Sequence, residues 1–326
     1  MSILITGSNG FVGSRLMWFL EDKGHEVWGI DNSKVCLREK HPHTINGDIR
    51  NIEDLRKFND KHFDLIIHCA AAKHDWGISK EGYYSNNEYG TKILMDYASE
   101  RNIKKVIYFS TVSVYGHKSV PCNETGKLQP DNEYGASKLA GEKVIENWLE
   151  QDSKRQVIFL RPSIIYGPNN YANMYNLIDM MHRKPWITIG NGKHIKSMIS
   201  LENLVDMTDF IISRMKPGLQ IFNTLDKPYI SVKRLVEIIA SNDGFCLPII
   251  RIPLFFAIFF GEIFDSLAFL AKKDLPINSD RMKKFDTSTE YYSEKIRQMG
   301  YIQKHTIEDE IRKTCKWYLK NLKKIR

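Results

Sequence analysis

A tyrosine and a lysine four residues apart, Tyr134 and Lys138, have the spacing needed for acid–base chemistry. They open a run from 133 to 149 that predicts a helix, and residues four apart lie on the same helix face. Tyrosine has a pKa near ~10, but a neighbouring ammonium favours its phenolate. A decrease of about three pKa units corresponds to roughly 4 kcal/mol. The pair is a candidate general base for an alcohol, unless it is an ordinary solvent-facing pair.

Hydroxyl groups follow a predicted strand over residues 106–110. Ser110, Thr111 and Ser113 come at its carboxyl end, where ligands bind in sheets of parallel strands. Thr111 is the candidate that hydrogen-bonds a substrate oxygen and shares its proton with Tyr134. Ser110 and Ser113 are weaker candidates for this role.

A glycine-rich turn lies near the start of the chain, between an apolar run at 3–5 and a helix-periodic run at 11–20. Gly7 permits backbone angles that a side chain forbids, and Gly10 leaves room for a phosphate to approach. Gly13 lets the helix pack tightly on the strand. Free N–H groups at a helix start attract a diphosphate, so the turn predicts a dinucleotide site.

Acidic residues follow the next two predicted strands. Asp31 closes the strand at 26–31 and lies 18 residues after Gly13, near the expected interval of about 20. A carboxylate there accepts both ribose hydroxyls and repels a 2′-phosphate, which predicts NAD rather than NADP. Lys34 and Arg38 could weaken that preference. Asp48, after the short strand at 44–46, is expected near the adenine amino group.

The elements that must position these residues alternate between strands and helices through the first half of the chain. This order predicts an α/β fold with a doubly wound parallel (Rossmann) sheet of six to seven strands. We expect residues 1–165 to form the NAD-binding domain, joined by some later segments. Residues 166–326 are expected to form mainly a smaller C-terminal α/β lobe that binds substrate, with closing helices.

Composition is that of an ordinary globular protein, with 42% apolar and 26% charged residues among 326. The net charge of +8 suits an anionic small substrate. Nucleic acid is not an expected partner, because the sequence contains neither a run of five basic residues nor a nucleic-acid-binding motif. The basic residues between 313 and 326 predict a solvated helix face, with an anionic membrane surface as the alternative.

Five cysteines with wide spacings and no CxxC pair argue against a disulfide framework and a zinc site. We therefore expect no metal site and a reducing, cytoplasmic location. The N-terminus enters a strand almost at once and has no signal-peptide pattern.

The apolar segment at 249–271 is the second unusual feature of the sequence. Its uninterrupted apolar run is shorter than the roughly 20 residues that span a bilayer. Burial within the lobe is the favoured interpretation, while a dimer interface and contact with a membrane are alternatives.

Taken together, these motifs resemble extended short-chain dehydrogenase/reductases, the NAD-dependent nucleotide-sugar epimerase/dehydratase family. The resemblance extends over nearly the whole chain and is closest to UDP-sugar 4-epimerases of polysaccharide and O-antigen pathways. The motifs that show it lie at 6–13, 31–32, 48–49, 68–71, 87–91, 110–116, 134–138, 161–162 and 166–168.

The motifs and this resemblance predict three sets of site residues. The catalytic set is Thr111, Tyr134 and Lys138. The cofactor set is Gly7, Asn9, Gly10, Phe11, Val12, Gly13, Asp31, Asn32, Asp48, Ile49, Ala70, Ala71, Lys73, Asn87, Ser110, Tyr134, Lys138 and Pro162. The substrate set is Lys73, Thr111, Ser113, Asn170 and Lys196, although Lys196 could instead face solvent.

The resemblance also implies individual roles. Lys138 would bind the nicotinamide ribose, Asn87 would support the nicotinamide side, and Lys73 would contact both cofactor and sugar. Two positions depart from the family patterns. Val112 and Ser113 stand where 4,6-dehydratases carry an Asp-Glu pair, which disfavours a dehydratase. Ile164 stands where UDP-galactose epimerases carry asparagine, which weakens the match to that enzyme.

The leading hypothesis is an NAD-dependent 4-epimerase of a nucleotide sugar, most plausibly a UDP-sugar, with Tyr134 as the base. Alternatives are a 4-ketoreductase of a nucleotide sugar, a hydroxysteroid-type dehydrogenase, and a non-catalytic dinucleotide sensor. The resemblance implies a homodimer through helices around 84–101 and 133–149.

Overall fold

The computed structural model describes residues 1–326 apart from 74–76, 118–119, 184–186, 254, 256–287 and 326. The chain divides into two compact units. Unit 1 comprises Met1–Ile165, Met198–Leu225 and Tyr291–Lys304. Unit 2 comprises Tyr166–Ser197, Asp226–Glu290 and His305–Arg326.

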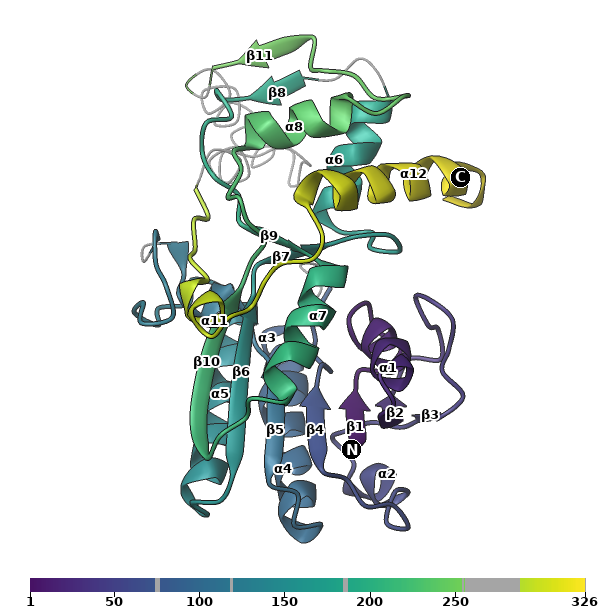
Figure 1. Ribbon diagram of the computed structural model, residues 1–326, viewed down its shortest axis with the longest axis vertical. Coiled ribbons are helices and arrows are strands. Elements are labelled where there is room, and N and C mark those ends of the chain that lie inside the picture. The colour runs from purple at the N-terminus through teal and green to yellow at the C-terminus, as the bar shows by residue number, and fades with distance from the viewer. Residues whose placement is uncertain (74–76, 118–119, 184–186, 254, 256–287, 326) are drawn as a thin grey trace, which may run out of the picture. The chain divides into compact units, whose positions relative to one another are not determined.

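Unit 1 contains a seven-stranded sheet in the order β10-β6-β5-β4-β1-β2-β3 (Figure 1). All its neighbouring strands are parallel, which confirms the doubly wound α/β fold expected from the sequence. The strands are β1 (Ser2–Thr6), β2 (Glu26–Asp31), β3 (Thr44–Asn46), β4 (Leu65–His68), β5 (Lys105–Phe109), β6 (Gln156–Pro162) and β10 (Gly218–Thr224).

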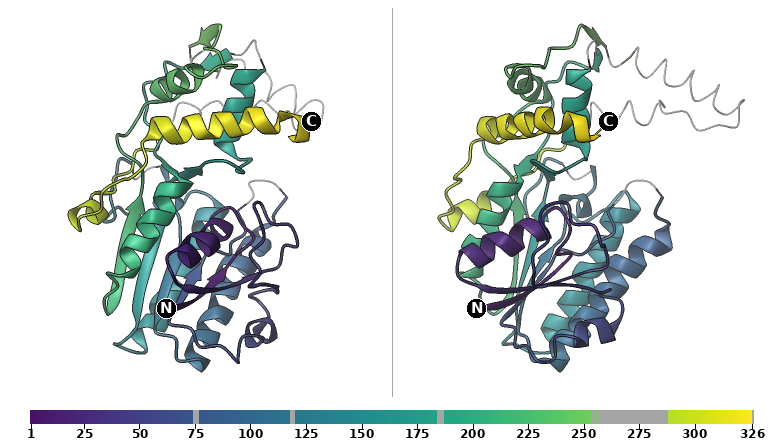
Figure 2. Two further views of the ribbon diagram at one scale, coloured as in Figure 1. Left: turned by 45° about the vertical axis from the view of Figure 1, so that its right-hand side comes forward. Right: turned by 90° about the vertical axis from the view of Figure 1, so that its right-hand side faces the viewer.

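Helices cover both faces of this sheet. They are α1 (Gly13–Asp22), α2 (Ile52–Arg56), α3 (Lys80–Tyr84), α4 (Gly90–Glu100), α5 (Glu133–Glu150), α7 (Leu201–Ile212) and α11 (Glu294–Gln298), with a π-helical turn η1 (Ser85–Tyr89) and a 3₁₀ turn η2 (Val112–Val114). Residues of α1 and α7 pack in one core cluster, and residues of α4 and α5 pack in the other. In the right-hand view of Figure 2 the sheet lies between the purple α1 and the blue and teal α4 and α5.

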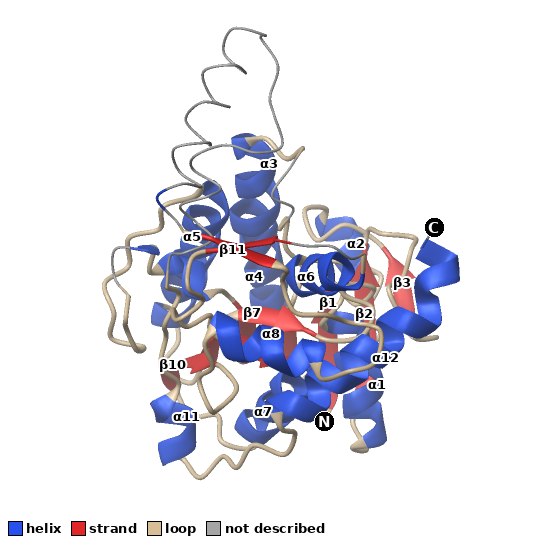
Figure 3. Cartoon of the chain, turned by 90° about the horizontal axis from the view of Figure 1, so that it is seen from above, coloured by secondary structure: helices blue, strands red, loops and turns tan. Residues whose placement is uncertain are grey.

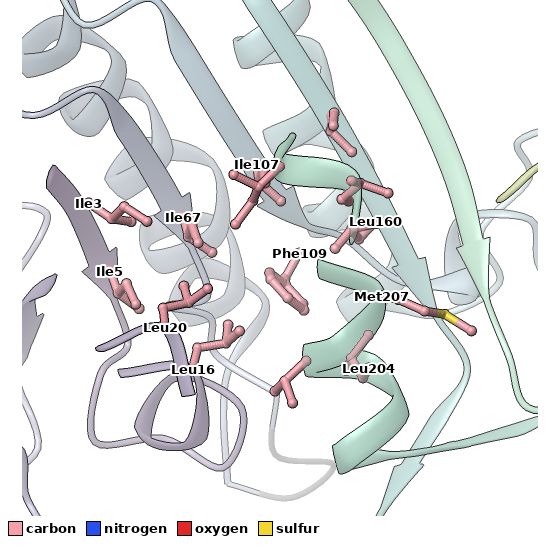
Figure 4. Packing of buried hydrophobic residues seen from close by; sticks show 14 of the residues in the cluster. Ile3, Ile5, Leu16, Leu20, Ile67, Ile107, Phe109, Leu160, Leu204 and Met207 are labelled. Atoms are coloured by element: carbon pink, nitrogen blue, oxygen red, sulfur yellow. The ribbon is translucent and has the colours of Figure 1, made fainter. Parts of the chain in front are cut away.

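Along the central strands of the sheet, alternate side chains enter opposite cores. Ile3 and Ile5 of β1 point into the first cluster, together with Ile107 of β5, while Leu4 points into the second. Figure 4 shows the first cluster, where these strand residues meet Leu16 of α1. Burial on both faces explains why the strands read as nearly continuous apolar runs.

The later segments of unit 1 include the seventh strand, β10, and helix α7, which come from residues beyond 165. One helix of unit 1 differs from the sequence expectation. The helix expected at 83–101 begins earlier, at Lys80, and contains the π-helical turn η1. Asn87 lies in that turn and hydrogen-bonds the backbone of Ala72, an interaction with a distant loop that periodicity cannot indicate.

Unit 2 contains helices α6 (Asn173–His182), α8 (Val232–Ala240) and α12 (Ile307–Ile325), and strands β8 (Ile187–Ile189) and β11 (Ile250–Ile252). The strands pair in parallel, and α12 packs against α6 and α8 (Figure 3). Tyr318 of α12 lies against the rings of Tyr175, His182 and Phe245. Thr306 caps the N-terminus of α12, since Asp309 N donates to Thr306 Oγ1 at 3.1 Å. A separate two-stranded sheet pairs β7 (Ile164–Tyr166) with β9 (Met198–Ser200).

Most of the apolar segment at 249–271 lies outside the described residues. Ile249 and Ile250 are described, and both side chains are exposed, which is opposite to the burial favoured for them from the sequence. Among the described residues, no helix combines the length and apolarity needed to cross a bilayer. None of the five cysteines forms a disulfide.

A buried ion pair joins helix α5 to the sheet. Arg161 of β6 donates from Nε and Nη2 to the two carboxylate oxygens of Glu142, at 2.9 and 2.6 Å. Its Nη1 donates to Tyr115 Oη at 2.9 Å, and Tyr115 in turn donates to Asn223 Oδ1 at 2.8 Å. All four side chains are buried, so each group depends on the others for the hydrogen bonds that water would otherwise provide.

Glu142→Ala should lower the free energy of unfolding by about 3–5 kcal/mol, because Arg161 would remain charged without a buried anion. Urea denaturation measures the change. Glu142→Leu combined with Arg161→Met should recover most of the loss, since neither charge remains. The exposed pair of Arg56 and Glu53 is the matched control, and Glu53→Ala should cost less than about 1 kcal/mol. Equal instability of the single and double variants would contradict this account.

Candidate active site

A cavity of about 560 Å³ lies in unit 1 at the carboxyl ends of the parallel strands. The residues around it come from the glycine turn, the ends of β2, β4, β5 and β6, and the start of α5. They include Gly7, Asn9, Gly10, Phe11, Val12, Gly13, Asp31, Asn32, Asp48, Ile49, Ala70, Ala71, Lys73, Ser110, Thr111, Tyr134 and Pro162. Most of the residues predicted for the cofactor therefore surround a single cavity.

The glycine turn between β1 and α1 is closed too tightly for side chains. Gly7 has φ of +70°, and a Cβ there would lie 2.7 Å from Ala70 N. A Cβ on Gly13 would lie 2.1 Å from Gly7 O. No side chain caps the start of α1, so the helix terminus keeps its partial positive charge facing the turn. The geometry suits a diphosphate.

The two predicted acidic residues have different partners. Asp31 accepts hydrogen bonds from Asn9 N at 2.9 Å and Ser33 N at 2.8 Å, which ties the glycine turn to the end of β2. Asp48 accepts from Arg50 Nε at 2.9 Å and Nη2 at 2.6 Å. Hydrogen bonds from Arg50 lower the pKa of Asp48 to about 2. Both carboxylates line the cavity, but that of Asp48 is already paired with a guanidinium.

Asn87 is buried and is absent from the residues that line the cavity. Its Oδ1 accepts from Ala72 N at 2.8 Å, and its Nδ2 donates to Ala72 O and to Ser137 Oγ at 3.0 and 2.9 Å. It thus fixes the loop after β4 to the start of α5. Its neighbour Asn86, which the sequence analysis did not select, does line the cavity.

The hydroxyl groups after β5 are arranged around η2. Thr111 Oγ1 accepts from Ser113 N at 3.1 Å and donates to Ser113 Oγ at 3.2 Å. Ser110 Oγ is buried and makes no hydrogen bond within the described part of the chain. Ser110 and Thr111 line the cavity, whereas Ser113 is not among its lining residues.

Tyr134 and Lys138 occupy different positions relative to the cavity. Tyr134 is half-buried and lines it, while Lys138 is buried and lies outside the lining residues. The Lys138 Nζ atom lies 3.9 Å from the centroid of the Tyr108 ring and makes no hydrogen bond to any described residue. Burial lowers the pKa of Lys138 to about 7.

Tyr108 and Gly141 are two residues that the sequence analysis missed. The ring of Tyr108, on β5, faces the ammonium of Lys138 and stabilises its charge through a cation–π contact. A Cβ on Gly141 would lie 2.3 Å from Tyr108 Oη. Glycine within a helix lowers stability by roughly 1 kcal/mol relative to alanine. The glycine inside α5 was therefore the available signal that another side chain packs closely against the helix at that position.

A buried histidine connects three elements beneath the site. His68 Nδ1 lies 2.7 Å from Thr6 Oγ1, and Nε2 lies 3.0 Å from Thr91 Oγ1. Thr91 Oγ1 also donates to the backbone oxygen of Asn87 at 2.7 Å. Burial lowers the pKa of His68 well below its ordinary value, so the ring is neutral at pH 7. The chain of contacts runs from the glycine turn to Asn87.

The remaining predicted substrate residues lie in different units. Lys73 lines the cavity of unit 1 with an exposed side chain. Asn170 and Lys196 belong to unit 2. Asn170 Oδ1 accepts from Ala172 N at 3.2 Å, and Lys196 forms a parallel bridge with Thr289. Their role in binding substrate stays a prediction.

Lys138→Met should stabilise the protein at low pH and much less at high pH. The native ammonium loses its proton near pH 7, whereas the unfolded chain keeps it up to the ordinary pKa of 10.5. Between these values the unfolded state binds more protons, so the stability of the unaltered protein rises with pH. The gain from Lys138→Met is therefore greatest below about pH 7 and shrinks toward about pH 10.

Urea denaturation at several pH values measures this difference. The exposed Lys143 lies on the same helix, and Lys143→Met should produce no such dependence on pH. A gain from Lys138→Met that stays constant with pH would mean that the lysine is not charged and buried at low pH.

Comparison with known proteins agrees with this geometry. The model of the NAD dependent epimerase/dehydratase family matches residues 3–224. The chain is 26% identical over 325 residues to N-acetyl-alpha-D-glucosaminyl-diphospho-ditrans,octacis-undecaprenol 4-epimerase of Escherichia coli O157:H7, covering 99% of this chain and 97% of that protein. It is 29% identical over 285 residues to UDP-glucose 4-epimerase of Vibrio cholerae, covering 81% and 82%.

A solved structure has the same fold. The UDP-glucuronic acid 4-epimerase of Bacillus cereus in complex with NAD superposes with a TM-score of 0.77 at 22% identity, covering 98% of this chain and 99% of that one. The family match spans well over half of the chain and includes the glycine turn, Thr111, Tyr134 and Lys138. The chain therefore belongs to the NAD dependent epimerase/dehydratase family and is an NAD-dependent enzyme with the fold of its epimerases.

Proposed function

We propose that this enzyme inverts the C4 hydroxyl of a sugar that is joined through a diphosphate to its carrier, by way of a transient 4-keto sugar. One observation carries the proposal. Tyr134 and Thr111 line the same cavity as the glycine turn and Asp31, so an alcohol and a dinucleotide can bind in one place.

The residues present fit NAD. A Cβ at Gly13 would fill the turn, as expected where a diphosphate must approach the backbone closely. Asp31 lies in the cavity wall, where a carboxylate can accept ribose hydroxyls. NAD, when bound there, would supply the acceptor for a hydride from C4 and then the donor of that hydride to the other face of the 4-keto sugar.

The side chains of the protein handle the proton. Tyr134 as phenolate accepts the C4 hydroxyl proton while C4 loses its hydride, and the products of this step are a ketone and a neutral phenol. The buried ammonium of Lys138 favours the phenolate, because an opposite charge in a poorly solvated site interacts strongly. Thr111 donates a hydrogen bond to the sugar oxygen. On return of the hydride, Tyr134 gives its proton back.

Two carriers are compatible with this chemistry. A nucleotide carrier, UDP, is favoured by the similarity to the Vibrio cholerae UDP-glucose 4-epimerase and by the resemblance in the motifs. A polyprenol is favoured by the Escherichia coli relative, which is named for a diphospho-undecaprenol-linked sugar and covers 99% of this chain. In either case the sugar is attached to a diphosphate, for which Asn170 and Lys196 are the proposed ligands.

A dehydratase is a poorer candidate, although dTDP-D-glucose 4,6-dehydratase of Homo sapiens is 26% identical over 98% of this chain. The two residues after Thr111 are Val112, which is buried, and Ser113. Neither can act as an acid or a base in the loss of water. An enzyme with valine and serine at these two positions can oxidise and reduce C4 but has no evident acid or base for the elimination of water.

Tyr134→Phe should reduce turnover by roughly 10²–10⁴-fold and leave the affinity for NADH unchanged, because only the proton acceptor is removed. Product NMR measures epimerisation, and protein fluorescence measures NADH binding. Tyr83→Phe is a matched control, since its ring lies 6.4 Å from that of Tyr134 and is buried.

The same assay tests the class of reaction and the carrier. UDP-N-acetylglucosamine and polyprenyl-diphospho-N-acetylglucosamine in detergent are compared as substrates. Epimerisation without a lasting change in absorbance near ~340 nm supports the proposal, because no reduced nicotinamide accumulates. Stoichiometric consumption of NADH with a 4-keto sugar would instead identify a reductase. Full activity of the Tyr134→Phe variant would show that Tyr134 is not the base.

Gly13→Ala should weaken NADH binding at least about ten-fold, which corresponds to roughly 1.4 kcal/mol, because the added methyl collides with the backbone of Gly7. Ser14→Ala is the neighbouring control. It removes a buried hydroxyl that makes no hydrogen bond within the described residues, and binding should change less than about two-fold. Calorimetry measures both, and unaltered binding by Gly13→Ala would place the diphosphate elsewhere.

A further inference from the structure

The positive charge of the protein is concentrated in one of its two units. Unit 1 contains 27 Lys and Arg residues against 26 Asp and Glu, a net charge of +1. Unit 2 contains 20 against 13, a net charge of +7, although it is the smaller unit. The proposed binding of one diphosphate does not require so large an excess, so unit 2 is suited to a more extended anionic partner.

Unit 2 also exposes a run of apolar side chains, which we name the apolar edge: Leu247, Ile249 and Ile250. Their exposed fractions are 52%, 66% and 54%. Ile250 is the first residue of β11, and Leu247 and Ile249 come just before it. Among the described strands, β11 pairs only with β8. The sequence stays apolar beyond it, from 252 to 260. Isolated exposed apolar residues are common, but consecutive ones indicate a contact surface.

Basic side chains lie near one end of this edge. Gly190 N donates to Ile252 O at 2.9 Å, and Lys233 N donates to Gly192 O at 2.8 Å, so the start of α8 is tied to the loop beside β11. Lys193, Lys233 and Arg234 in this region are all exposed. Figure 1 shows α8 next to β8 and β11 within unit 2. Further exposed lysines, Lys316 and Lys320, lie on α12, which packs against α8.

We propose that unit 2 docks on the surface of an anionic lipid bilayer through the apolar edge and its neighbouring basic residues. Exposed apolar side chains beside lysines and arginines fit the boundary between acyl chains and anionic headgroups. A nucleic acid would be attracted by the positive charge but would leave the three aliphatic side chains without an apolar partner. A second copy of the chain would bring the same positive charge to the contact and would be repelled. The proposed contact is peripheral, at the surface of the bilayer.

This inference goes beyond the proposed reaction and holds for either carrier. It would also place a polyprenol-linked sugar and the enzyme at the same surface. Because membrane binding is measured without substrate, its failure would leave the proposed epimerisation untouched.

Flotation of the purified full chain with vesicles tests the proposal. The probes are vesicles of phosphatidylethanolamine and phosphatidylglycerol at about 3:1 and vesicles of phosphatidylcholine alone. The protein should float with the anionic vesicles, less with the neutral ones, and less again when salt is raised to about 0.5 M, because screening weakens the attraction.

The triple variant Leu247→Ser, Ile249→Ser, Ile250→Ser should lower the floated fraction at least about five-fold. Lys193→Glu with Lys233→Glu should lower it on anionic vesicles only. The matched control is Leu128→Ser with Ile302→Ser, two exposed apolar residues of unit 1, which should float like the unaltered protein. Thermal melting and turnover of a water-soluble substrate check that each variant is folded.

Three results would overturn the proposal. The unaltered protein could fail to float with either vesicle. The triple variant could float as well as the control. Light scattering could show that the triple variant converts a dimer to a monomer while vesicle binding is unchanged, which would make the apolar edge an interface between copies of the chain.

Discussion

Helix α5 buries two cations against the sheet, and the described structure supplies an anion to only one of them. Arg161 is neutralised by both oxygens of Glu142, while Lys138, one helical turn before Glu142, faces the ring of Tyr108. The first arrangement holds the helix in place and the second leaves a charge partly unsatisfied beside the cavity. In the proposed mechanism, the ammonium form of Lys138 supplies the electrostatic stabilisation for the phenolate of Tyr134 on the same helix.

Much of the fold could be predicted from the sequence because its signals are local. Five of the first six strands contain an apolar run, the exception being the short β3, and glycine, acid and hydroxyl residues mark where strands end. The seventh strand could not be placed, since β10 joins the sheet through pairing with β6, and pairing between distant segments leaves no local pattern. The π-helical turn was missed as well, and it contains Asn87, which accepts a hydrogen bond from the backbone of Ala72, 15 residues earlier in the chain.

The candidate site shows the same division. Chemical type and spacing selected the residues proposed to touch a ligand, and three of them, Asp31, Thr111 and Tyr134, line the cavity. The residues that act behind them, Tyr108 and Gly141, are chemically ordinary and become informative only when the sheet and helix are placed together. The sequence also favoured burial of Ile249 and Ile250, whereas the structure exposes both. Apolar side chains are expected to be removed from water, but their sequence does not indicate which surface they pack against.

Unit 1 is assembled from three separate stretches of chain, and this affects how it can be made. When residue 165 leaves the ribosome, β6 still lacks its outer neighbour, because β10 is synthesised more than 50 residues later. Until then the apolar strand at 156–162 is an open edge that can pair with another nascent chain. A fragment cut at the apparent end of the first domain would retain that edge permanently and would be prone to aggregate. The early part of the chain therefore contains the recognition chemistry, but it cannot form the finished sheet until the later segments arrive.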